Sequence, residues 1–447
     1  MEAALIQKYN VAAPRYTSYP TVPYWDHESF SAAKWVEVIP TTYNAFADEG
    51  ISLYIHLPYC ESLCTYCGCN TRITKNHGVE QPYITALLKE WAMYCDILGS
   101  RPKIKELHLG GGTPTFFGAE NLGSLISHIL ENADLAPHAQ LSFEAHPANT
   151  TREHLTILYA LGFRRLSLGI QDFDPKVQFL INRFQTPEQV EKVTNEARLI
   201  GYNSINFDLI YGLPAQNLQG LTDTINDVIR LHPDRIAFYS YAHVPWLKPG
   251  QRHFTEKDLP IGDEKFALYE KGREMLIDAG YQDVGMDHFA LKSDSLYQAG
   301  QAKLLHRNFM GYTDQHTHLL IGLGVSSISD GWTGFAQNPK TVEAYLKKIG
   351  AGMLPVEKGH ILTNEDLENR QHILDMMCRE TTVFENGIPA PVKERLLPLL
   401  KDGLVFFDDT TIALTLLGKS YIRNVCMAFD ERLWAKQAEK HLFSSSI

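Results

Sequence analysis

The feature that most constrains the fold is a regular alternation of short apolar runs and helical stretches that begins at residue 51. The apolar runs are rich in β-branched residues, which is typical of strands. They are ISLYIHL (51–57), IKELHLG (104–110), LSFEA (141–145), RRLSLGI (164–170), SINFDLIYG (204–212) and RIAFYSYA (235–242), and helical patterns between them include 82–98, 120–133 and 187–201. Six such units predict an α/β fold with a parallel sheet and right-handed crossovers. The pattern alone leaves open whether that sheet is a partly closed barrel or an open, doubly wound sheet.

The segments on either side of this alternation differ in character. Residues 1–50 contain four prolines and the aromatic stretch RYTSYPTVPYW, so we expect a non-helical arm that packs on the body. A helix (264–279), a strand (281–285) and a loop-rich stretch to Asn338 follow the sixth strand. The remainder predicts helices and two short strands, an order compatible with a winged-helix-like domain; the helices are 365–379, 391–401 and 416–428, and the strands lie near 403–407 and 411–415. The predicted division is therefore 1–50, 51–338 and 339–447.

Charge and cysteine content exclude several classes of protein. The formal net charge of -11 and the lack of a dense basic stripe argue against nucleic-acid binding. No basic segment followed by an apolar run marks a signal peptide, and no apolar run reaches the roughly 18 residues of a membrane span. Seven cysteines, four of them within 60–69, make a poor disulfide framework. We therefore expect a cytoplasmic protein in which Cys95, Cys378 and Cys426 are buried thiols.

The strongest local motif is CESLCTYCGC (60–69), on the loop after the first strand. Cys60, Cys64 and Cys67 are spaced so that their thiolates can converge on one iron–sulfur cluster. Three ligands leave one iron open to a small molecule. A structural zinc site with Cys69 as fourth ligand is the alternative, although such sites usually draw their cysteines from two separate knuckles.

Other unusual residues gather where the predicted strands end. They are Gly110–Gly112, Glu144, Gln171, Asp208 and His243. The carboxyl ends of parallel strands form the edge at which α/β folds place their chemistry. The turn Gly110-Gly111-Gly112-Thr113-Pro114-Thr115 matches neither a P-loop nor a dinucleotide fingerprint, and a site for the amino and carboxylate groups of a zwitterion is a sensible interpretation.

The cysteine loop followed by GGGTPT resembles the radical S-adenosylmethionine (SAM) superfamily, and within it the oxygen-independent coproporphyrinogen III oxidases. The carrying segments are RYTSYPT (15–21), YIHLPYCESLCTYCGCN (54–70), LHLGGGTPT (107–115), LSLGIQDF (166–173), FDLIYGLP (207–214), YAHVP (241–245), GMDHFA (285–290), HRNFMGYT (306–313) and RNVCMAFD (423–430). This resemblance implies a partial (β/α)6 parallel barrel with an N-terminal arm and a small, mostly helical C-terminal domain.

The resemblance also implies a reaction. A 4Fe–4S cluster on Cys60, Cys64 and Cys67 would bind SAM and, once reduced, cleave it to a 5′-deoxyadenosyl radical. That radical would abstract a hydrogen from the β-carbon of a propionate, and loss of CO₂ and an electron would leave a vinyl group. Two such steps convert coproporphyrinogen III to protoporphyrinogen IX. The protein would position these groups and exclude water.

Residue by residue, the resemblance implies a set of SAM contacts that includes a second SAM molecule. The set is Tyr54, Tyr66, Gly111, Gly112, Thr113, Glu144, Gln171, Arg183, Asp208, Ala242 and Ile328. The residues support it in part, because a carboxylate at a strand end, as at Glu144 and Asp208, can accept hydrogen bonds from ribose or from the amino group of SAM. Without the resemblance, a helix cap or a core aromatic remains an alternative at several of these positions.

A substrate with four propionates requires cationic and hydrogen-bonding groups. Candidates are Arg15, Tyr16, His243, His288, His306 and Arg307, and the role of Cys69 stays open. The chain departs from the family pattern at His146 and Ala148, because His146-Pro147-Ala148 stands where an acidic residue followed by Pro-Arg would be usual. It departs again at Phe184, where a polar residue would be usual. We expect these departures to affect substrate specificity rather than cluster or SAM binding.

Two other functions remain in view. A related haem chaperone keeps a cluster but transports haem; such relatives show Cys-Asp-Phe after the cluster cysteines and lack the RYTSYPT arm, whereas this chain has Cys67-Gly68-Cys69 and the arm. A radical SAM enzyme for another tetrapyrrole is the third. For the oxidase we expect a porphyrinogen substrate, an electron donor such as flavodoxin or ferredoxin, no nucleic-acid or membrane partner, and a monomer.

Overall fold

The computed structural model describes residues 2–26, 28–435 and 443. Among these, a 12-stranded sheet has the order β16-β15-β14-β13-β1-β4-β5-β6-β7-β8-β10-β9. Its centre is six parallel strands in chain order, which confirms the predicted α/β fold. They are β1 (Ile51–Leu57), β4 (Lys103–Gly111), β5 (Asp134–Ala145), β6 (Phe163–Gln171), β7 (Ser204–Tyr211) and β8 (Arg235–Ser240).

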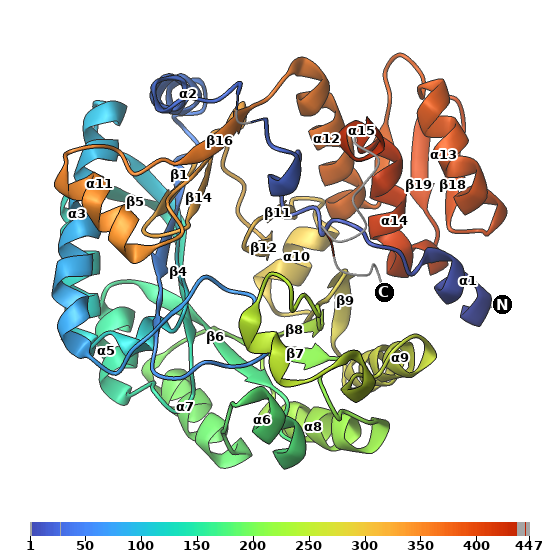
Figure 1. Cartoon of the computed structure of the whole chain (residues 1–447), viewed down its shortest axis with the longest axis horizontal. Coiled ribbons are helices and arrows are strands. Elements are labelled where there is room, and N and C mark those ends of the chain that lie inside the picture. The colour runs from blue at the N-terminus through green and yellow to red at the C-terminus, as the bar shows by residue number, and fades with distance from the viewer. Residues whose placement is uncertain (1, 27, 436–442, 444–447) are drawn as a thin grey trace.

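The helices lie along the outer side of this curved sheet (Figure 1). They are α3 (Glu80–Leu98), α4 (Ala119–Glu131), α5 (Arg152–Ala160), α6 (Pro175–Ile181), α7 (Pro187–Ile200), α8 (Leu218–Leu231) and α9 (Asp263–Asp278). Alternate strand residues such as Leu107 and Leu109 pack with helix residues in one hydrophobic core. Their neighbours Glu106 and His108 face a cavity instead. Helices on one face favour the barrel-like arrangement over a doubly wound sheet, and the described strands do not close it.

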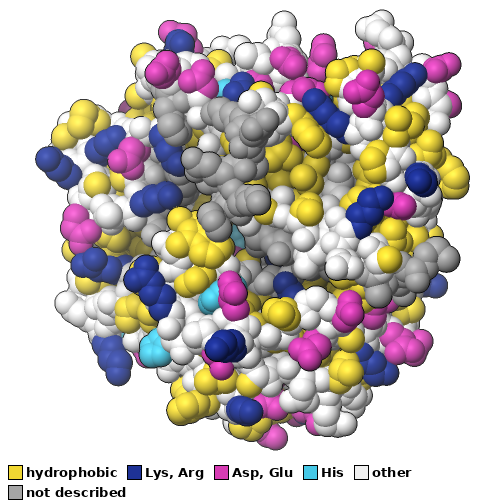
Figure 2. Space-filling model, turned by 45° about the vertical axis from the view of Figure 1, so that its right-hand side comes forward, with side chains coloured by type: hydrophobic (Ala, Val, Ile, Leu, Met, Phe, Trp, Pro, Cys, Tyr) yellow, Lys and Arg dark blue, Asp and Glu magenta, His cyan; other side chains and the backbone are white. Residues whose placement is uncertain are grey.

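The outer surface carries charges of both signs. Figure 2 shows Lys and Arg interspersed with Asp and Glu over the face it presents, without a continuous basic stripe. Among the described residues, no helix is long and apolar enough to cross a membrane.

The first fifty residues contain two helices, α1 (Glu2–Tyr9) and α2 (Ala32–Ala45), where we expected none. Helix α2 tolerates Pro40 in its interior because Trp35, Ile39 and Tyr43, one turn apart, are buried in the main core. Their burial offsets the hydrogen bond that proline cannot make. The expectation of a non-helical arm was therefore wrong over these two segments, although RYTSYPT itself is irregular.

Several strands beyond the six-strand core fall in the stretch predicted to be loop-rich. Strand β13 (Leu320–Leu323) pairs in parallel with β1, and β14 (Ile328–Asp330), β15 (Gly334–Gln337) and β16 (Lys358–Ile361) continue the sheet antiparallel. At the other edge lie β10 (His288–Ala290) and β9 (Gln282–Gly285), the latter at the position of the strand predicted for 281–285. A separate pair is formed by β11 (His306–Asn308) and β12 (Gly311–Thr313). Helices α10 (Ser295–Gln301) and α11 (Val342–Gly350) complete this part.

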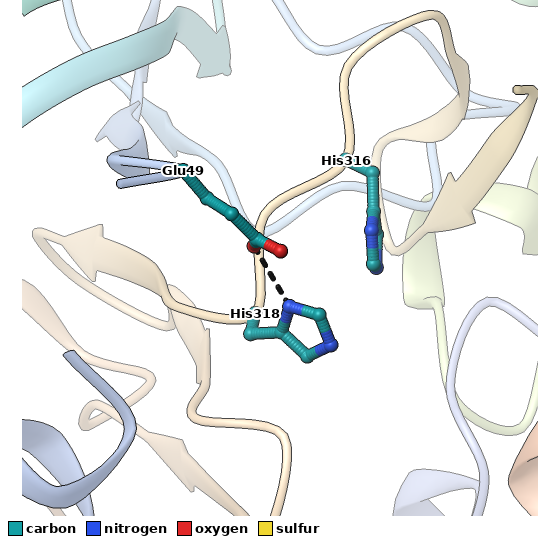
Figure 3. Close-up of side chains that lie close together, drawn as sticks. All are labelled: Glu49, His316 and His318. Atoms are coloured by element: carbon teal, nitrogen blue, oxygen red, sulfur yellow. Dashed lines mark hydrogen bonds and ion pairs between the residues drawn. The ribbon is translucent and has the colours of Figure 1, made fainter. Parts of the chain in front are cut away.

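Beside β1 and β13, the residues that precede the two strands meet. Glu49 precedes β1, and His318 precedes β13; His318 Nδ1 lies 2.7 Å from a carboxylate oxygen of Glu49 (Figure 3). The contact joins the amino ends of two neighbouring parallel strands.

The C-terminal region is built from α12 (Asn364–Arg379), α13 (Ala390–Lys401), α14 (Ile422–Cys426), α15 (Glu431–Ala435) and a small sheet in the order β17-β19-β18. The strands are β17 (Thr381–Val383), β18 (Val405–Phe407) and β19 (Thr411–Leu414). The single helix expected at 416–428 is broken into α14 and two 3₁₀ turns. Gly418 lies in the first of these turns and packs so closely on Leu404 that a Cβ would lie 1.9 Å from the carbonyl oxygen of Leu404.

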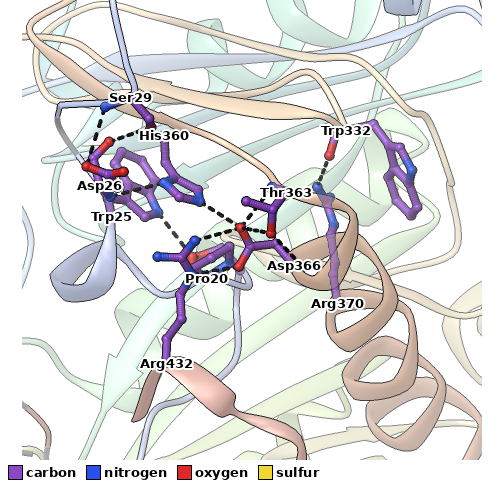
Figure 4. Close-up of polar contacts among 11 residues, drawn as sticks. Pro20, Trp25, Asp26, Ser29, Trp332, His360, Thr363, Asp366, Arg370 and Arg432 are labelled. Carbon is purple, nitrogen blue, oxygen red and sulfur yellow. Dashed lines mark hydrogen bonds and ion pairs between the residues drawn. The ribbon is translucent and has the colours of Figure 1, made fainter. Parts of the chain in front are cut away.

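The N-terminal arm contacts this C-terminal region. Leu5, Tyr9, Tyr16 and Tyr19 belong to a hydrophobic cluster made mainly of residues from Ile373 onward. A polar network lies beside it (Figure 4). Its centre is Asp366, which accepts hydrogen bonds from Arg432 at 2.6 and 2.7 Å and lies 3.2 Å from His360. The division of the chain at residues 50 and 338 stays a prediction.

Candidate active site

A cavity of about 640 Å³ lies on the concave face of the sheet. The cysteine loop, the glycine turn after β4 and alternate residues of strands β4–β8 line it. The carboxyl ends of the central strands therefore converge on one site, as the sequence pattern predicted. Of the strand-end residues singled out in the sequence, Cys60, Gly111, Gly112, Glu144, Gln171 and Asp208 line the cavity; Gly110 and His243 do not.

The cysteine loop forms one wall of the cavity. Cys60, Cys64, Cys67 and Cys69 all line it, and Cys60 ends the short strand β2 (Tyr59–Cys60), which pairs with β3 (Arg72–Ile73). The segment around α6 holds the loop: Thr65 N donates to the carbonyl of Ile181 at 2.9 Å, and the Asn182 amide donates to the carbonyl of Leu63 at 2.8 Å. A loop fixed at several points presents its thiols as one set.

The thiols differ in acidity. Burial raises the pKa of Cys60 to about 11, although the Thr113 hydroxyl 3.3 Å away opposes this. A hydrogen bond from Cys69 lowers the pKa of Cys67 and raises the pKa of Cys69. Arg183 Nη1 donates to Cys64 Sγ at 3.7 Å, so a fixed cation faces this group of thiols. Thiolates are the iron ligands of such clusters, and a nearby guanidinium favours them.

The glycine turn packs against this loop. The amide of Gly112 donates to the carbonyl of Leu57 at 2.8 Å, and that of Thr113 to the carbonyl of Tyr59 at 3.0 Å. A Cβ on Gly112 would lie 2.6 Å from backbone atoms of Pro58. Gly111 has φ +115°, where its missing side chain leaves room for the His56 ring. The turn thus needs glycine in order to hold its backbone against the cysteine loop.

Two carboxylates, Glu144 and Asp208, line the cavity. Glu144, on β5, accepts from the amide of Gly111 at 3.2 Å and lies 3.4 Å from His108 Nε2. Burial raises its pKa, but the hydrogen bond and charge of His108, together with the Gly111 amide, lower it below the usual value overall. Asp208, on β7, accepts from Ser167 and Asn206 at 3.1 and 2.8 Å. Burial, reinforced by the charge of Glu144, raises the pKa of Asp208 to about 7.

Buried polar atoms in the cavity wall lack partners among the residues that the structure describes. Two of them are Gln171 Oε1 and Arg183 Nε. Gln171 has φ +67°, a left-handed conformation that is uncommon outside glycine. Both side chains crowd Gly169, where a Cβ would lie 2.8 Å from each. Unsatisfied buried groups aimed at a cavity indicate a polar ligand. Three thiols with a facing cation, two carboxylates and these atoms fit an iron–sulfur cluster and a zwitterionic cofactor.

Three of the residues implied as SAM contacts do not line the cavity. Tyr54, on β1, is buried, and its hydroxyl forms a hydrogen bond with His56 Nδ1 at 3.1 Å. Ala242 follows β8, and its carbonyl shares the Gln251 amide with the carbonyl of Tyr66. Ile328 begins β14 and packs in a small cluster that includes Trp25. The other eight residues of the set line the cavity.

The substrate candidates divide into two groups. His288 lines the cavity, and its buried Nδ1 has no partner in the described part of the chain. Burial, with the charges of Arg307, Arg235 and Arg15, lowers the pKa of His288 to about 3, so its ring is neutral. The other five candidates do not line the cavity. Arg15 pairs with Asp287 at 3.2 Å, and the Tyr16 hydroxyl donates a hydrogen bond to Asp430 at 3.1 Å. Arg307 lies over the ring of Tyr312, His243 hydrogen-bonds the Tyr241 hydroxyl, and His306 packs on His316.

The three departures from the family pattern also lie at the cavity. His146, Ala148 and Phe184 line it, and Phe184 is 59% exposed. Burial, followed by the charge of Arg183, lowers the pKa of His146 to about 3. The side chains at these three positions therefore present an uncharged and largely apolar surface to a ligand.

Sequence reasoning missed the polar floor of the cavity. Glu106, His108, Arg165 and Arg235 line it at alternate strand positions. Arg235 Nε donates to Asp294 at 2.6 Å, and both arginines lie 3.7 Å from Asp314. The signal was present, because period-2 alternation of polar and apolar residues marks the cavity-facing side of each strand.

Comparisons with known proteins agree with this geometry. Residues 54–228 match the model of the radical SAM superfamily. The chain is 37% identical to the oxygen-independent coproporphyrinogen III oxidase of Salmonella typhimurium and 36% identical to that of Escherichia coli, in each case over 100% of this chain and 98% of the relative. The solved structure of coproporphyrinogen III oxidase from Escherichia coli, described as a radical SAM enzyme, superposes with a TM-score of 0.87 at 35% identity, covering 96% of this chain and 98% of that one.

Proposed function

The chain belongs to the oxygen-independent coproporphyrinogen III oxidase family of the radical SAM superfamily, and on this premise we propose that it converts coproporphyrinogen III to protoporphyrinogen IX. The observation that carries the proposal is the similarity over the full length of relatives with this activity in their names. The cavity supports it, because the cysteine motif and the strand-end carboxylates lie together there. The reaction is the oxidative decarboxylation of two propionates to vinyl groups without oxygen.

The enzyme uses a 4Fe–4S cluster and SAM, which when bound supply the 5′-deoxyadenosyl radical that takes a hydrogen atom from a propionate β-carbon. We assign cluster ligation to Cys60, Cys64 and Cys67, and charge stabilisation at the thiolates to Arg183, which donates to Cys64. Glu144 accepts hydrogen bonds from the SAM amino group or ribose, while His108 and the Gly111 amide hold its carboxylate in place. Gln171 and Asp208 supply further polar contacts, and a second SAM molecule beside the first is part of the proposal.

His288 is the substrate candidate best supported by the structure. Its ring lies edge-on to Tyr239 and Tyr312, with centroids 5.7 and 5.3 Å away, and its unpartnered Nδ1 is available to a propionate. The charges of Arg307, Arg235 and Arg15 make the surroundings of His288 electropositive. We further propose that the enzyme is a cytoplasmic monomer, takes electrons from a flavodoxin or ferredoxin and binds no nucleic acid.

The function is tested by turnover. Anaerobically reconstituted, reduced protein given SAM and coproporphyrinogen III should release CO₂ and 5′-deoxyadenosine and form protoporphyrinogen IX. The reaction without SAM is the control. Formation of 5′-deoxyadenosine without CO₂ would mean that the substrate is wrong, and stoichiometric haem binding without turnover would favour a haem chaperone.

The role of Glu144 gives a separate prediction. Glu144→Gln should weaken SAM binding about 10-fold, because a charge-assisted hydrogen bond of about 1.5–3 kcal/mol is replaced by a neutral one of about 0.5–1.5 kcal/mol. The new amide also meets the N–H of Gly111, which now bonds the carboxylate. Equilibrium dialysis of labelled SAM against cluster-loaded protein measures the change. Glu120→Gln, at an exposed position of α4, is the matched control and should bind like the parent. Equal affinity in all three proteins would exclude Glu144 from the SAM site.

A further inference from the structure

The amino ends of β1 and β13 carry a group of side chains that the reaction does not use. Glu49 precedes β1, and His316 and His318 precede β13. One ligand atom from each of the three lies within 4.8 Å of the others (Figure 3). Strand β1 runs from this group toward the cysteine loop and spans seven residues, roughly 20 Å at about 3.3 Å per residue. The group is therefore separate from the cavity that holds the cluster motif.

From this cluster we infer that Glu49, His316 and His318 bind a divalent transition-metal ion such as zinc. Two imidazoles and one carboxylate are a donor set that suits zinc and its neighbours in the first row. In a tetrahedral zinc site with bonds of about 2.0–2.1 Å, ligand atoms lie roughly 3.3 Å apart. The present spread of at most 4.8 Å exceeds that distance, so the side chains draw closer together when an ion binds. All three residues are only partly buried, so an ion has access to them.

The backbone around the site is fixed before any ion binds. Thr317, between the two histidines, is buried and bonds the Ser52 hydroxyl at 2.8 Å on the opposite side of the loop. The amide of Ser52 donates to the carbonyl of Leu319 at 3.0 Å, and Lys105 Nζ donates to the carbonyl of His316 at 3.0 Å. A His-x-His loop held in this way directs both imidazoles to one side. Preorganisation lowers the entropic cost of binding.

An ion pair alone does not account for the arrangement. Glu49 and His318 already pair at 2.7 Å, and His318 stacks on Phe46 with ring centroids 3.6 Å apart. His316 contributes nothing to that pair, yet its ring centroid lies 4.6 Å from that of His318. His306 lies 4.4 Å from His316 on the other side and is the nearest further imidazole. A shared cation explains why several imidazoles gather around one carboxylate, and it would tie β1 to β13 at the edge of the sheet remote from the chemistry.

The test uses anaerobic, cluster-loaded protein dialysed with zinc and then against zinc-free buffer, with zinc, iron and sulfide counted per chain. The parent should retain about one zinc, and its thermal midpoint should rise with added zinc. His316→Gln and Glu49→Gln should each bind zinc at least 10-fold more weakly and lose that thermal shift. His128→Gln, an exposed histidine on α4, is the matched control and should behave like the parent.

The outcomes separate this site from the cysteine loop. Zinc retained equally by the parent and by both variants, or no zinc retained by the parent, would overturn the inference. Unchanged iron and sulfide counts show that the variants are folded and that zinc has not replaced the cluster. Because the readout is zinc content and thermal shift, the result does not depend on whether the enzyme acts on coproporphyrinogen.

Discussion

Cys64→Ala is expected to abolish both the iron–sulfur cluster and the reaction. Removal of one of the three thiolate ligands leaves only two donors for the cluster. Arg183, which donates to Cys64 Sγ in the parent, also loses its thiolate partner. Cluster binding depends on all ligands together, so we expect iron and sulfide to fall below about a tenth of the parent value. The formation of 5′-deoxyadenosine should fall at least about 1,000-fold, because the residual iron is not held as an intact cluster that can cleave SAM. Iron and sulfide counts, visible absorbance and nucleoside analysis measure these losses.

Two cysteine variants serve as controls. Cys95→Ala, on α3 away from the cavity, should keep the cluster and the activity. Cys69→Ala is more informative, because Cys69 lines the cavity and hydrogen-bonds Cys67. If the site is a three-ligand iron–sulfur cluster, Cys69→Ala retains the metal content of the parent, whereas a four-cysteine zinc site would lose its metal. Full iron content in Cys64→Ala, or loss of metal in Cys69→Ala equal to that in Cys64→Ala, would contradict the ligand assignment.

The six central strands could be predicted because each is an uninterrupted apolar or alternating run with β-branched residues. The gathering of Cys60, Glu144, Gln171 and Asp208 at one edge followed from parallel pairing alone. The short strands β13 to β16 could not be found in the same way. Runs of three or four residues that contain Gly322 or Gly334 carry too few alternations to be told from loop.

Helix α2 was missed for a different reason. A proline inside a helix normally argues against it, and only the tertiary burial of Trp35 and Ile39 reverses that preference. The positions of the substrate candidates also depend on tertiary structure. His306 and Arg307 are neighbours in the sequence, but their side chains have different contacts in the structure. On strand β11, His306 packs on His316, whereas Arg307 lies over the ring of Tyr312. The side on which each lies follows from pairing with β12, which no local pattern specifies.

Asp366→Asn is expected to destabilise the protein by about 2–4 kcal/mol, because it breaks a buried charged network by removing one partner. Asp366 is only 3% exposed, and its carboxylate accepts two hydrogen bonds from Arg432. The carboxylate also accepts a hydrogen bond from the backbone amide of Thr363, the N-cap residue of α12. Asparagine keeps the shape but loses the charge and one acceptor. Urea unfolding followed by tryptophan fluorescence measures the change. Asp409→Asn removes an exposed partner of Lys393 and should cost less than about 0.5 kcal/mol.

The pH dependence distinguishes this network from simple packing. Burial raises the pKa of Asp366, but hydrogen bonds from His360 and Arg432 lower it far below its usual value. A carboxyl whose pKa is lower in the folded state stabilises the fold above its unfolded pKa of about 3.9, and this contribution is lost as the pH falls from there toward the folded pKa. The stability difference between the parent and Asp366→Asn should therefore be constant from about pH 5 to 7 and shrink below pH 4. A difference that persists unchanged at pH 3 would mean that packing, rather than the charge of Asp366, holds α12 to the segment that carries Arg432.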